Sequence, residues 1–318
     1  MLTRRIRPIF LIGIFAALTV ALAQSNRGRP AMRRHTATTS QPLRLVPATE
    51  EPEVDSRHDR RTENGTLVLE ANGIPEHKVG QFPNRGNPHT IEEQRYFFKI
   101  PADPKVADQV TPLHFSASVQ GPPNRPFGVA MNGVLLDPGT AEFWRGDREL
   151  DWNYEALGGA VGLGLDENHA HVQPDGSYHY HGLPTLYLKQ LGADGTRHSP
   201  QIGWAADGFP VYASYGYGDA NDPTSPIIEL TSSYRLKSGK RPDGDLGPGG
   251  NYDGAFVRDY EYVNGLGSLD ECNGRYCATP EFPDGTYAYF LTKSWPVVPR
   301  YFRGQPVDLR SPGRRPRR

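Results

Sequence analysis

The sequence predicts a mainly β, loop-rich antiparallel domain with an internally repeated hairpin unit and few short helices. Three observations support this fold class. The 318 residues include 35 glycines and 30 prolines, which favour turns over long helices. Amphipathic stretches of helical length are few, whereas short runs rich in tyrosine, valine and phenylalanine lie between turn residues. Two distant segments also share a turn motif together with the residues that flank it.

Six short runs are predicted as strands because their apolar residues alternate, or run on, between turn residues. In chain order they are residues 66–71, 94–100, 127–135, 178–181, 210–215 and 287–292. Residues 186–191 are predicted as a short turn of helix. The long connections between these runs are polar and glycine-rich, which is typical of surface loops.

The first 23 residues predict an export signal. Three arginines precede an apolar run over residues 9–20, and Ala21-Leu22-Ala23 supplies a small-x-small cleavage site. The apolar run is too short for a convincing membrane span. We therefore expect a secreted or periplasmic protein with no stable membrane span after signal cleavage.

Composition divides the rest of the chain into three parts. Residues 24–62 are rich in arginine, threonine, proline, serine and glutamate, so we expect a disordered linker. Residues 303–318 are mostly proline, glycine and arginine, so a disordered basic tail is expected there. Residues 63–302 remain as the folded domain, which is long enough for one sizeable core.

Formal charge is distributed unevenly along the chain. Residues 1–62 hold eleven arginines against five acidic residues, a net of +6, and residues 303–318 have a net of +5. The whole chain is −1, so residues 63–302 carry −12. An acidic body argues against a nucleic-acid-binding protein, which concentrates positive charge on its folded domain. The same body is compatible with cation binding.

Histidines gather around one turn. His169, His171, His179 and His181 fall within thirteen residues, with Pro174-Asp175-Gly176 between the two pairs. This tripeptide suits a three-residue hairpin loop that ends on a glycine with positive φ. His171 then faces His179, His169 faces His181, and all four imidazoles share one side of the ribbon. A two-residue Asp-Gly loop would shift the register and divide them between the two faces.

This spacing predicts a metal site. Imidazole is the commonest protein ligand for zinc and copper, and three or four together make a centre. Ten histidines scattered over 318 residues would seldom place four at paired spacing. Two alternatives stay open, namely stacked or hydrogen-bonded structural histidines and a polar hairpin that faces solvent.

The histidine hairpin has a counterpart near the end of the domain. Residues 165–171 align with residues 269–275, and residues 174–181 align with residues 283–290. The second copy has Ala288 and Phe290 where the first has His179 and His181. If the duplication is real, the first hairpin is specialised for chemistry and the second packs as core. Chance convergence on turn chemistry is the alternative.

Cys272 and Cys277 are the two cysteines of the chain. In an exported protein they predict a small loop-closing disulfide. A metal site built on them would need further ligands nearby, and the sequence offers none.

Several strings of the sequence together resemble the YHYH domain family, named for the tetrapeptide that stands here at residues 178–181. The similarity covers most of residues 64–302, in segments 72–77, 170–182, 207–212, 252–256, 269–275 and 279–287. It implies an exported bacterial-type protein and brings no settled activity with it. His171, His179 and His181 fall on the family pattern, whereas many members are expected to have asparagine in place of His169. His77 also falls on a family motif and is a distant candidate to complete the ligand shell.

The leading hypothesis is a secreted metalloprotein in which these histidines bind one transition-metal ion, zinc or copper first and iron as a further option. An open coordination position would support a metal-dependent hydrolase or oxidoreductase acting on an unknown small molecule or polysaccharide. Asp207 or Asp166 is predicted as base or as orienter of a ligand. Tyr180, with Tyr178, is predicted beside the ion.

Two other classes of function compete with this hypothesis. One is a non-catalytic module that binds envelope polysaccharide through exposed aromatic residues, for which the candidates are Tyr178, Tyr180, Trp204, Tyr212, Tyr215 and Tyr217. Packing of the same aromatics as core is the simpler alternative. The other class is a metal carrier without turnover. Motifs of serine hydrolases, phosphate-binding loops, zinc proteases and dinucleotide sites are missing from the sequence.

Overall fold

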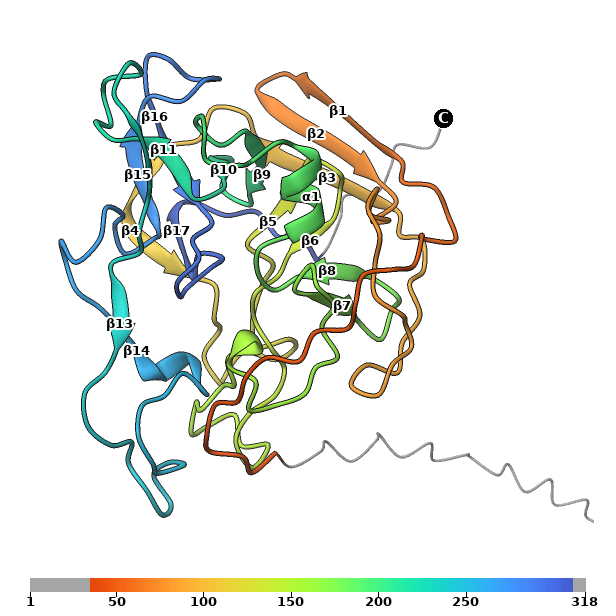
Figure 1. Cartoon of the computed structure of the whole chain (residues 1–318), viewed down its shortest axis with the longest axis vertical. Helices are drawn as coiled ribbons and strands as arrows, with labels where there is room; N and C mark the ends of the chain where they lie inside the picture. The colour runs from red at the N-terminus through yellow and green to blue at the C-terminus, as the bar shows by residue number, and fades with distance from the viewer. Residues whose placement is uncertain (1–34, 311–318) are drawn as a thin grey trace, which may run out of the picture. The chain divides into compact units, whose positions relative to one another are not determined.

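A computed structural model describes residues 35–310, so the predicted signal peptide lies outside the described residues. Strands and loops dominate this part of the chain, which holds a single α-helix, α1 (Thr185–Gln190), and two 3-10 turns, Ala156–Gly158 and Val257–Asp259. The predicted fold class is therefore confirmed (Figure 1). Within residues 35–310, no helix has the length and apolar character that crossing a membrane requires.

Eight strands form the central sheet of the described residues. They are β5 (Gly128–Ala130), β6 (Leu135–Leu136), β7 (Ala170–Val172), β8 (Tyr178–Tyr180), β9 (Gln201–Ala205), β10 (Pro210–Tyr212), β15 (Gly274–Cys277) and β16 (Thr286–Phe290). Their order across the sheet is β15-β16-β10-β9-β5-β6-β8-β7. A three-stranded sheet contains β1 (His58–Glu63), β2 (Thr66–Ala71) and β3 (Tyr96–Pro101). The remaining strands pair as ribbons, namely β4 (Val106–Pro112) with β17 (Tyr301–Gly304), β11 (Tyr215–Tyr217) with β12 (Ile227–Glu229), and β13 (Tyr234–Leu236) with β14 (Tyr260–Tyr262).

The central sheet consists of two four-stranded units with the same pairing pattern. In the first, β5 and β6 form an antiparallel hairpin, β6 runs parallel to β8, and β8 pairs antiparallel with β7. In the second, β9 and β10 form the hairpin, β10 runs parallel to β16, and β16 pairs antiparallel with β15. The predicted hairpin repeat is confirmed, and it extends to four strands. The two repeated hairpins form opposite edges of the sheet (Figure 1).

The two units meet where β5 pairs with β9. Val129 pairs with Trp204. On one side of this pair a glycine of the first unit faces an alanine of the second, and on the other side an alanine of the first unit faces a glycine of the second. Gly128 and Gly203 occupy matching positions, and at each a Cβ would collide with a carbonyl oxygen of the opposite strand. Glycine at both positions allows the units to approach closely and form one continuous sheet.

Most predicted elements match the structure closely. Residues 66–71 coincide with β2, and the predicted helix differs from α1 by one residue at each end. Two predicted strands, at residues 127–135 and 210–215, are each divided in two by a turn or a break in pairing. The first division is at Gly133, whose φ of +80° belongs to the turn between β5 and β6.

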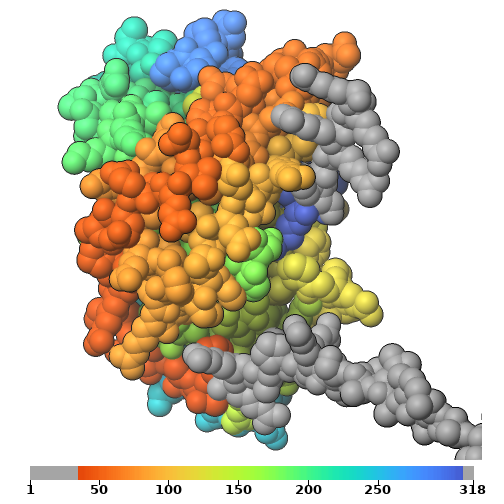
Figure 2. All heavy atoms as spheres, turned by 90° about the vertical axis from the view of Figure 1, so that its right-hand side faces the viewer, coloured from red at the N-terminus to blue at the C-terminus, as the bar shows by residue number. Residues whose placement is uncertain are grey.

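Residues 35–62 fall within the predicted disordered linker, but the structure orders them. Strand β1 pairs with β2 along its whole length, and residues 46 and 50 form bridges to residues 166 and 79. Figure 2 shows this segment, coloured red to orange, spread over the surface of later residues. The linker prediction is wrong here because backbone hydrogen bonds to existing strands hold the segment, and composition does not report such bonds.

The folded region also continues beyond residue 302. Strand β17 pairs with β4, and Leu309 is buried in the main core. The prediction of a disordered basic tail from residue 303 is therefore wrong for residues 303–310. Sequence composition missed this because one strand and one buried leucine suffice to anchor a polar segment.

The predicted disulfide is not formed, since Cys272 and Cys277 are both free and buried. Cys272 packs in the main core with Tyr287 and Tyr289, whereas Cys277 packs in a separate cluster with Tyr212 and Phe290. The two thiols thus belong to different apolar clusters. Burial also raises the pKa of both thiols, which keeps them protonated.

Candidate metal centre

The histidine hairpin has the predicted three-residue loop. His171 pairs with His179 across β7 and β8, and the Gln173 amide donates to the Ser177 carbonyl at 2.9 Å. Gly176 closes the turn at a φ of +83°, which favours glycine. This register places His171 and His179 on the same face of the ribbon, as the Pro-Asp-Gly signal predicts.

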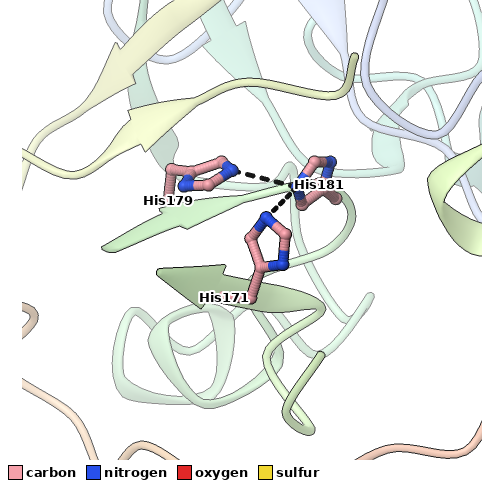
Figure 3. Close-up of side chains that lie close together, drawn as sticks. All are labelled: His171, His179 and His181. Atoms are coloured by element: carbon pink, nitrogen blue, oxygen red, sulfur yellow. Dashed lines mark hydrogen bonds between the residues drawn. The ribbon is translucent and has the colours of Figure 1, made fainter. Parts of the chain in front are cut away.

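Three of the four clustered imidazoles converge. Nε2 of His181 lies 2.9 Å from Nε2 of His179 and 3.0 Å from Nε2 of His171. Figure 3 shows the three rings turned toward one another, with His171 rising from β7 to meet the two histidines of the β8 arm. We call His171, His179 and His181 the histidine trio. Within the described residues it is the group of histidine, cysteine and acidic side chains that is close enough to hold one metal ion.

His169 does not join the trio. Its φ is +52°, so its backbone leaves the alternation of a strand just before β7 begins. Its Nδ1 instead lies 2.9 Å from the Leu183 carbonyl. The expectation that four imidazoles share one face is thus wrong for this residue. Asn273, its counterpart in the second hairpin, has a φ of +56°, so the bend belongs to the repeated scaffold.

His77 is also outside the trio. Nε2 of His77 lies 2.7 Å from the Tyr180 hydroxyl, and its Nδ1 lies 2.8 Å from the Lys78 carbonyl. Because neighbouring strand residues point to opposite faces, Tyr180 lies on the face of β8 away from His179 and His181. Asn132 donates to the same hydroxyl at 3.1 Å. Tyr180, predicted beside the ion, therefore belongs to the hydrogen-bonded core with His77.

Asp166 and Asp207 stabilise the fold of the two units and do not line the cavity beside the trio. Asp166 accepts hydrogen bonds from the Tyr178 hydroxyl at 2.7 Å and from the Gly80 amide at 2.9 Å. Asp207 accepts from the Tyr289 hydroxyl at 2.5 Å and from the Gly304 amide at 2.8 Å. The structure thus brings neither predicted carboxylate into the cavity wall beside the trio.

The repeat explains why these acids occur in motifs. Asp270 of the second unit accepts from the Tyr287 hydroxyl at 3.0 Å, as Asp166 does from Tyr178 in the first. Asp207 bonds Tyr289 where Asn132 bonds Tyr180 in the first unit. Each pair performs the same task in its own unit. A string that repeats for structural reasons can therefore be mistaken for a catalytic motif.

Two backbone carbonyls define which ring nitrogen carries hydrogen in His171 and His179. Nδ1 of His171 donates to the Leu163 carbonyl at 2.9 Å, and Nδ1 of His179 donates to the Ser177 carbonyl at 3.3 Å. A carbonyl can only accept, so both Nδ1 atoms carry hydrogen and both Nε2 atoms present lone pairs. These lone pairs are directed at His181, which in its neutral form has a single N–H. The Pro138 carbonyl faces the buried His181 ring as a hydrogen-bond acceptor, although Nδ1 of His181 makes no hydrogen bond of good geometry among the described residues.

A metal ion fits this arrangement. One cation between the three Nε2 atoms would accept all their lone pairs and remove the conflict between them. With zinc–nitrogen bonds of about 2.0–2.1 Å, tetrahedral geometry places ligand nitrogens about 3.3 Å apart. The trio would need to open only slightly from its present separations.

Burial keeps the trio neutral. It lowers the pKa of His171 to about 4, and it lowers the pKa values of His179 and His181 well below 6.5. The neighbouring imidazoles lower these pKa values further. Neutral imidazole is the form that binds metal, so protons compete little with an ion at neutral pH.

The trio lines one wall of a cavity of about 370 Å³. Other polar residues of the wall are Asn87, His89, Asn124, Thr140, Glu142, Gln173 and Arg310. A cavity of this size is within the range of small-molecule sites. Sequence reasoning missed His89 and Arg310, because they reach the cavity from segments that no shared motif links to the hairpin.

The second hairpin shows that the scaffold does not require histidine. Arg275, Ala288 and Phe290 stand where the first hairpin has His171, His179 and His181. Ala288 and Phe290 are completely buried in an apolar cluster. The same backbone can therefore be filled by apolar packing, and the trio is specific to the first unit.

Three of the six aromatic residues considered for polysaccharide binding are buried. Tyr178, Tyr180 and Tyr212 are each at most 1% exposed and pack in apolar clusters. This result contradicts a binding face built on them. The simpler alternative of core packing is correct for these three tyrosines.

The pKa values of the trio predict a pH-dependent stability of the metal-free protein. As the pH falls below 6.5, the unfolded chain takes up protons on these histidines before the folded chain does. The free energy of unfolding then decreases, by up to about 1.4 kcal/mol per pH unit for each histidine. For His171 this loss continues down to about pH 4. Urea unfolding between pH 7.5 and 5.0 measures it.

The matched control for this prediction copies the second hairpin. A His179→Ala/His181→Phe variant should lose less stability over the same pH interval. It removes two of the three histidines whose protonation is suppressed in the folded protein. An equal pH dependence in both proteins would show that the trio does not titrate as its burial requires.

Fold and site together define a β protein of two related units, one of which carries a buried triple-histidine cluster beside a cavity. Residues 97–304 match the family model described as YHYH protein. The match spans well over half of the chain, so the protein belongs to the YHYH protein family. No curated protein and no solved structure matches the chain.

Proposed function

We propose that this YHYH protein is an exported metalloprotein whose histidine trio binds one transition-metal ion, zinc or copper first and iron as a further option. The observation that carries the proposal is the convergence of three Nε2 atoms in a buried, neutral cluster. Hydrogen bonds from Nδ1 of His171 and His179 to backbone carbonyls orient two of the rings, as is usual for metal-binding histidines.

The cavity supports action on a small molecule. Three protein ligands leave a coordination position for water or substrate, and the trio is part of the cavity wall. Such an ion makes bound water more acidic and supports hydrolysis, whereas copper or iron supports redox chemistry. A metal-dependent hydrolase or oxidoreductase is therefore the proposed class. His89 and Gln173 are wall residues able to contact a substrate.

Export is the second part of the proposal. The arginines, apolar run and small-residue cleavage site of residues 1–23 support a signal peptide, and hence a secreted or periplasmic protein. N-terminal sequencing of the protein recovered outside the cytoplasm tests both the export and the cleavage site. The mature chain is expected to begin at Gln24.

Metal analysis of the purified mature protein tests the site. We expect about one equivalent of zinc, copper or iron per chain, bound in competition with a weak chelator. Turnover of model esters, phosphates or phenols that disappears with the trio would establish an enzyme. Metal held without any turnover would establish a carrier. Failure to retain any of these metals would refute the proposed centre.

A further inference from the structure

The cavity wall beside the trio contains a cation with unused hydrogen-bonding groups. Nη2 of Arg310 donates to Oδ2 of Asp137 at 2.8 Å. Among the described residues the other N–H groups of this guanidinium have no partner, and the Arg310 side chain lines the cavity with the trio. An arginine held at one corner of its planar group can present the remaining donors to a ligand.

Asp137 fixes the position of Arg310 next to the trio. It follows β6, and its amide donates to the Tyr180 carbonyl at 2.9 Å, one residue before His181. The Asp137 side chain is 3% exposed, and its Oδ1 has no partner among the described residues. Nε2 of Gln173 lies 3.4 Å from Oδ2 of the same carboxylate. Arg310 is thus tied to the pairing of β6 with β8, the strand that contains His179 and is followed directly by His181.

The segment that brings Arg310 to the cavity is anchored through the residues just before it. The Val307 amide donates to the Ala206 carbonyl at 3.0 Å, and Leu309 is 1% exposed in the main core. The Arg310 amide donates to Asp308 at 2.9 Å. A buried leucine immediately before Arg310 therefore restrains where the guanidinium can reach.

With a metal ion on the trio, the balance of charge favours an anionic ligand. Asp137 already pairs with the charge of Arg310, Glu142 is the acidic residue among those that line the cavity, and the three imidazoles are neutral, so the cavity gains a positive excess only when an ion occupies the trio. A divalent ion on the trio would add two positive charges on the same wall. The cavity would then hold a metal ion and a fork of N–H donors, which together suit a group with two or three oxygens.

We propose that this cavity binds a small molecule through an oxyanion, a carboxylate or a phosphate, held between Arg310 and the metal ion of the trio. This inference rests on the proposed function and names its substrate class. A carboxylate and a phosphate share the same recognition chemistry here. The two sources are separated by the titrations that follow.

The test is a calorimetric titration of the metal-loaded full chain with inorganic phosphate, with acetate, and with neutral acetamide. We expect one of the two anions to bind and acetamide not to bind. Arg310→Gln should keep its metal content and bind the preferred anion at least about tenfold more weakly, a factor that corresponds to about 1.4 kcal/mol. Arg310→Lys, which keeps the charge but not the fork, should fall between the two.

Arg303→Gln is the matched control. It removes the same charge from the same end of the chain, but Arg303 does not line the cavity, so affinity should be unchanged. Equal anion affinity in Arg310→Gln and the wild type, or no anion binding to the metal-loaded protein, would overturn the inference while leaving the metal centre intact. If the wild type holds no metal, the proposed function fails. Anion binding by the metal-free chain that is lost in Arg310→Gln would then still support the oxyanion site, and its absence would refute it.

Discussion

A His179→Ala/His181→Ala variant is expected to lose its metal. Each Nε2 atom of the trio lies within 3.0 Å of at least one other, so removal of two rings leaves a single ligand. Loss of an outer hydrogen-bond partner already weakens metal binding by about 10- to 100-fold, so loss of two ligands must weaken it further. Metal content after dialysis against a weak chelator measures the change.

His169→Ala is the matched control for this experiment. His169 belongs to the same histidine-rich hairpin, but its Nδ1 contacts the Leu183 carbonyl and it lies outside the trio. We expect this variant to keep its metal. Equal loss of metal from both variants would mean that His169 is a ligand or that the hairpin has unfolded. Circular dichroism distinguishes these two cases.

A large loss of stability is expected from Arg300→Met. Arg300 donates to both oxygens of Glu155 at 2.9 and 2.8 Å, and their side chains are 9% and 2% exposed. Breaking a buried ion pair on one side leaves the other charge without compensation, at a cost of about 3–5 kcal/mol in the free energy of unfolding. Denaturant unfolding followed by fluorescence measures this loss.

Two further variants test the explanation. Arg235→Met breaks the exposed pair of Arg235 with Glu261 and should cost less than about 1 kcal/mol. Adding Glu155→Leu to Arg300→Met should restore part of the lost stability, because the uncompensated charge is removed. Full recovery is not expected, since the Trp295 indole also donates to Glu155 at 2.8 Å. An effect of Arg300→Met no larger than that of Arg235→Met would contradict the assigned role of the buried pair.

The local part of the site was accessible from the sequence because a hairpin is a local structure. Pro174-Asp175-Gly176 defines the loop, the loop defines the register, and the register places His171 opposite His179. The same reasoning failed at His169, where one residue with positive φ rotates the side chain out of the common face. Strand alternation cannot report such a residue, since any non-glycine position is expected to have negative φ.

The remaining candidates failed for a different reason. Asp166, Asp207 and Tyr180 stand in distinctive strings, but those strings maintain hydrogen bonds that recur in both units. Their motifs are informative about the fold rather than the site. Arg310 and His89 reach the cavity from residues far from the hairpin, and no local pattern indicates that they do so.

The sequence by itself determined the strand-rich class, most of the strands, the repeat of the hairpin and the pairing of His171 with His179. These features follow from turn chemistry and side-chain alternation, which act over a few residues. The tertiary structure decided which histidines converge, which acids are structural, which residues line the cavity and how far the folded region extends within the described residues. Those outcomes depend on contacts between segments far apart in the chain, such as Arg310 with Asp137, which no local rule of conformation specifies.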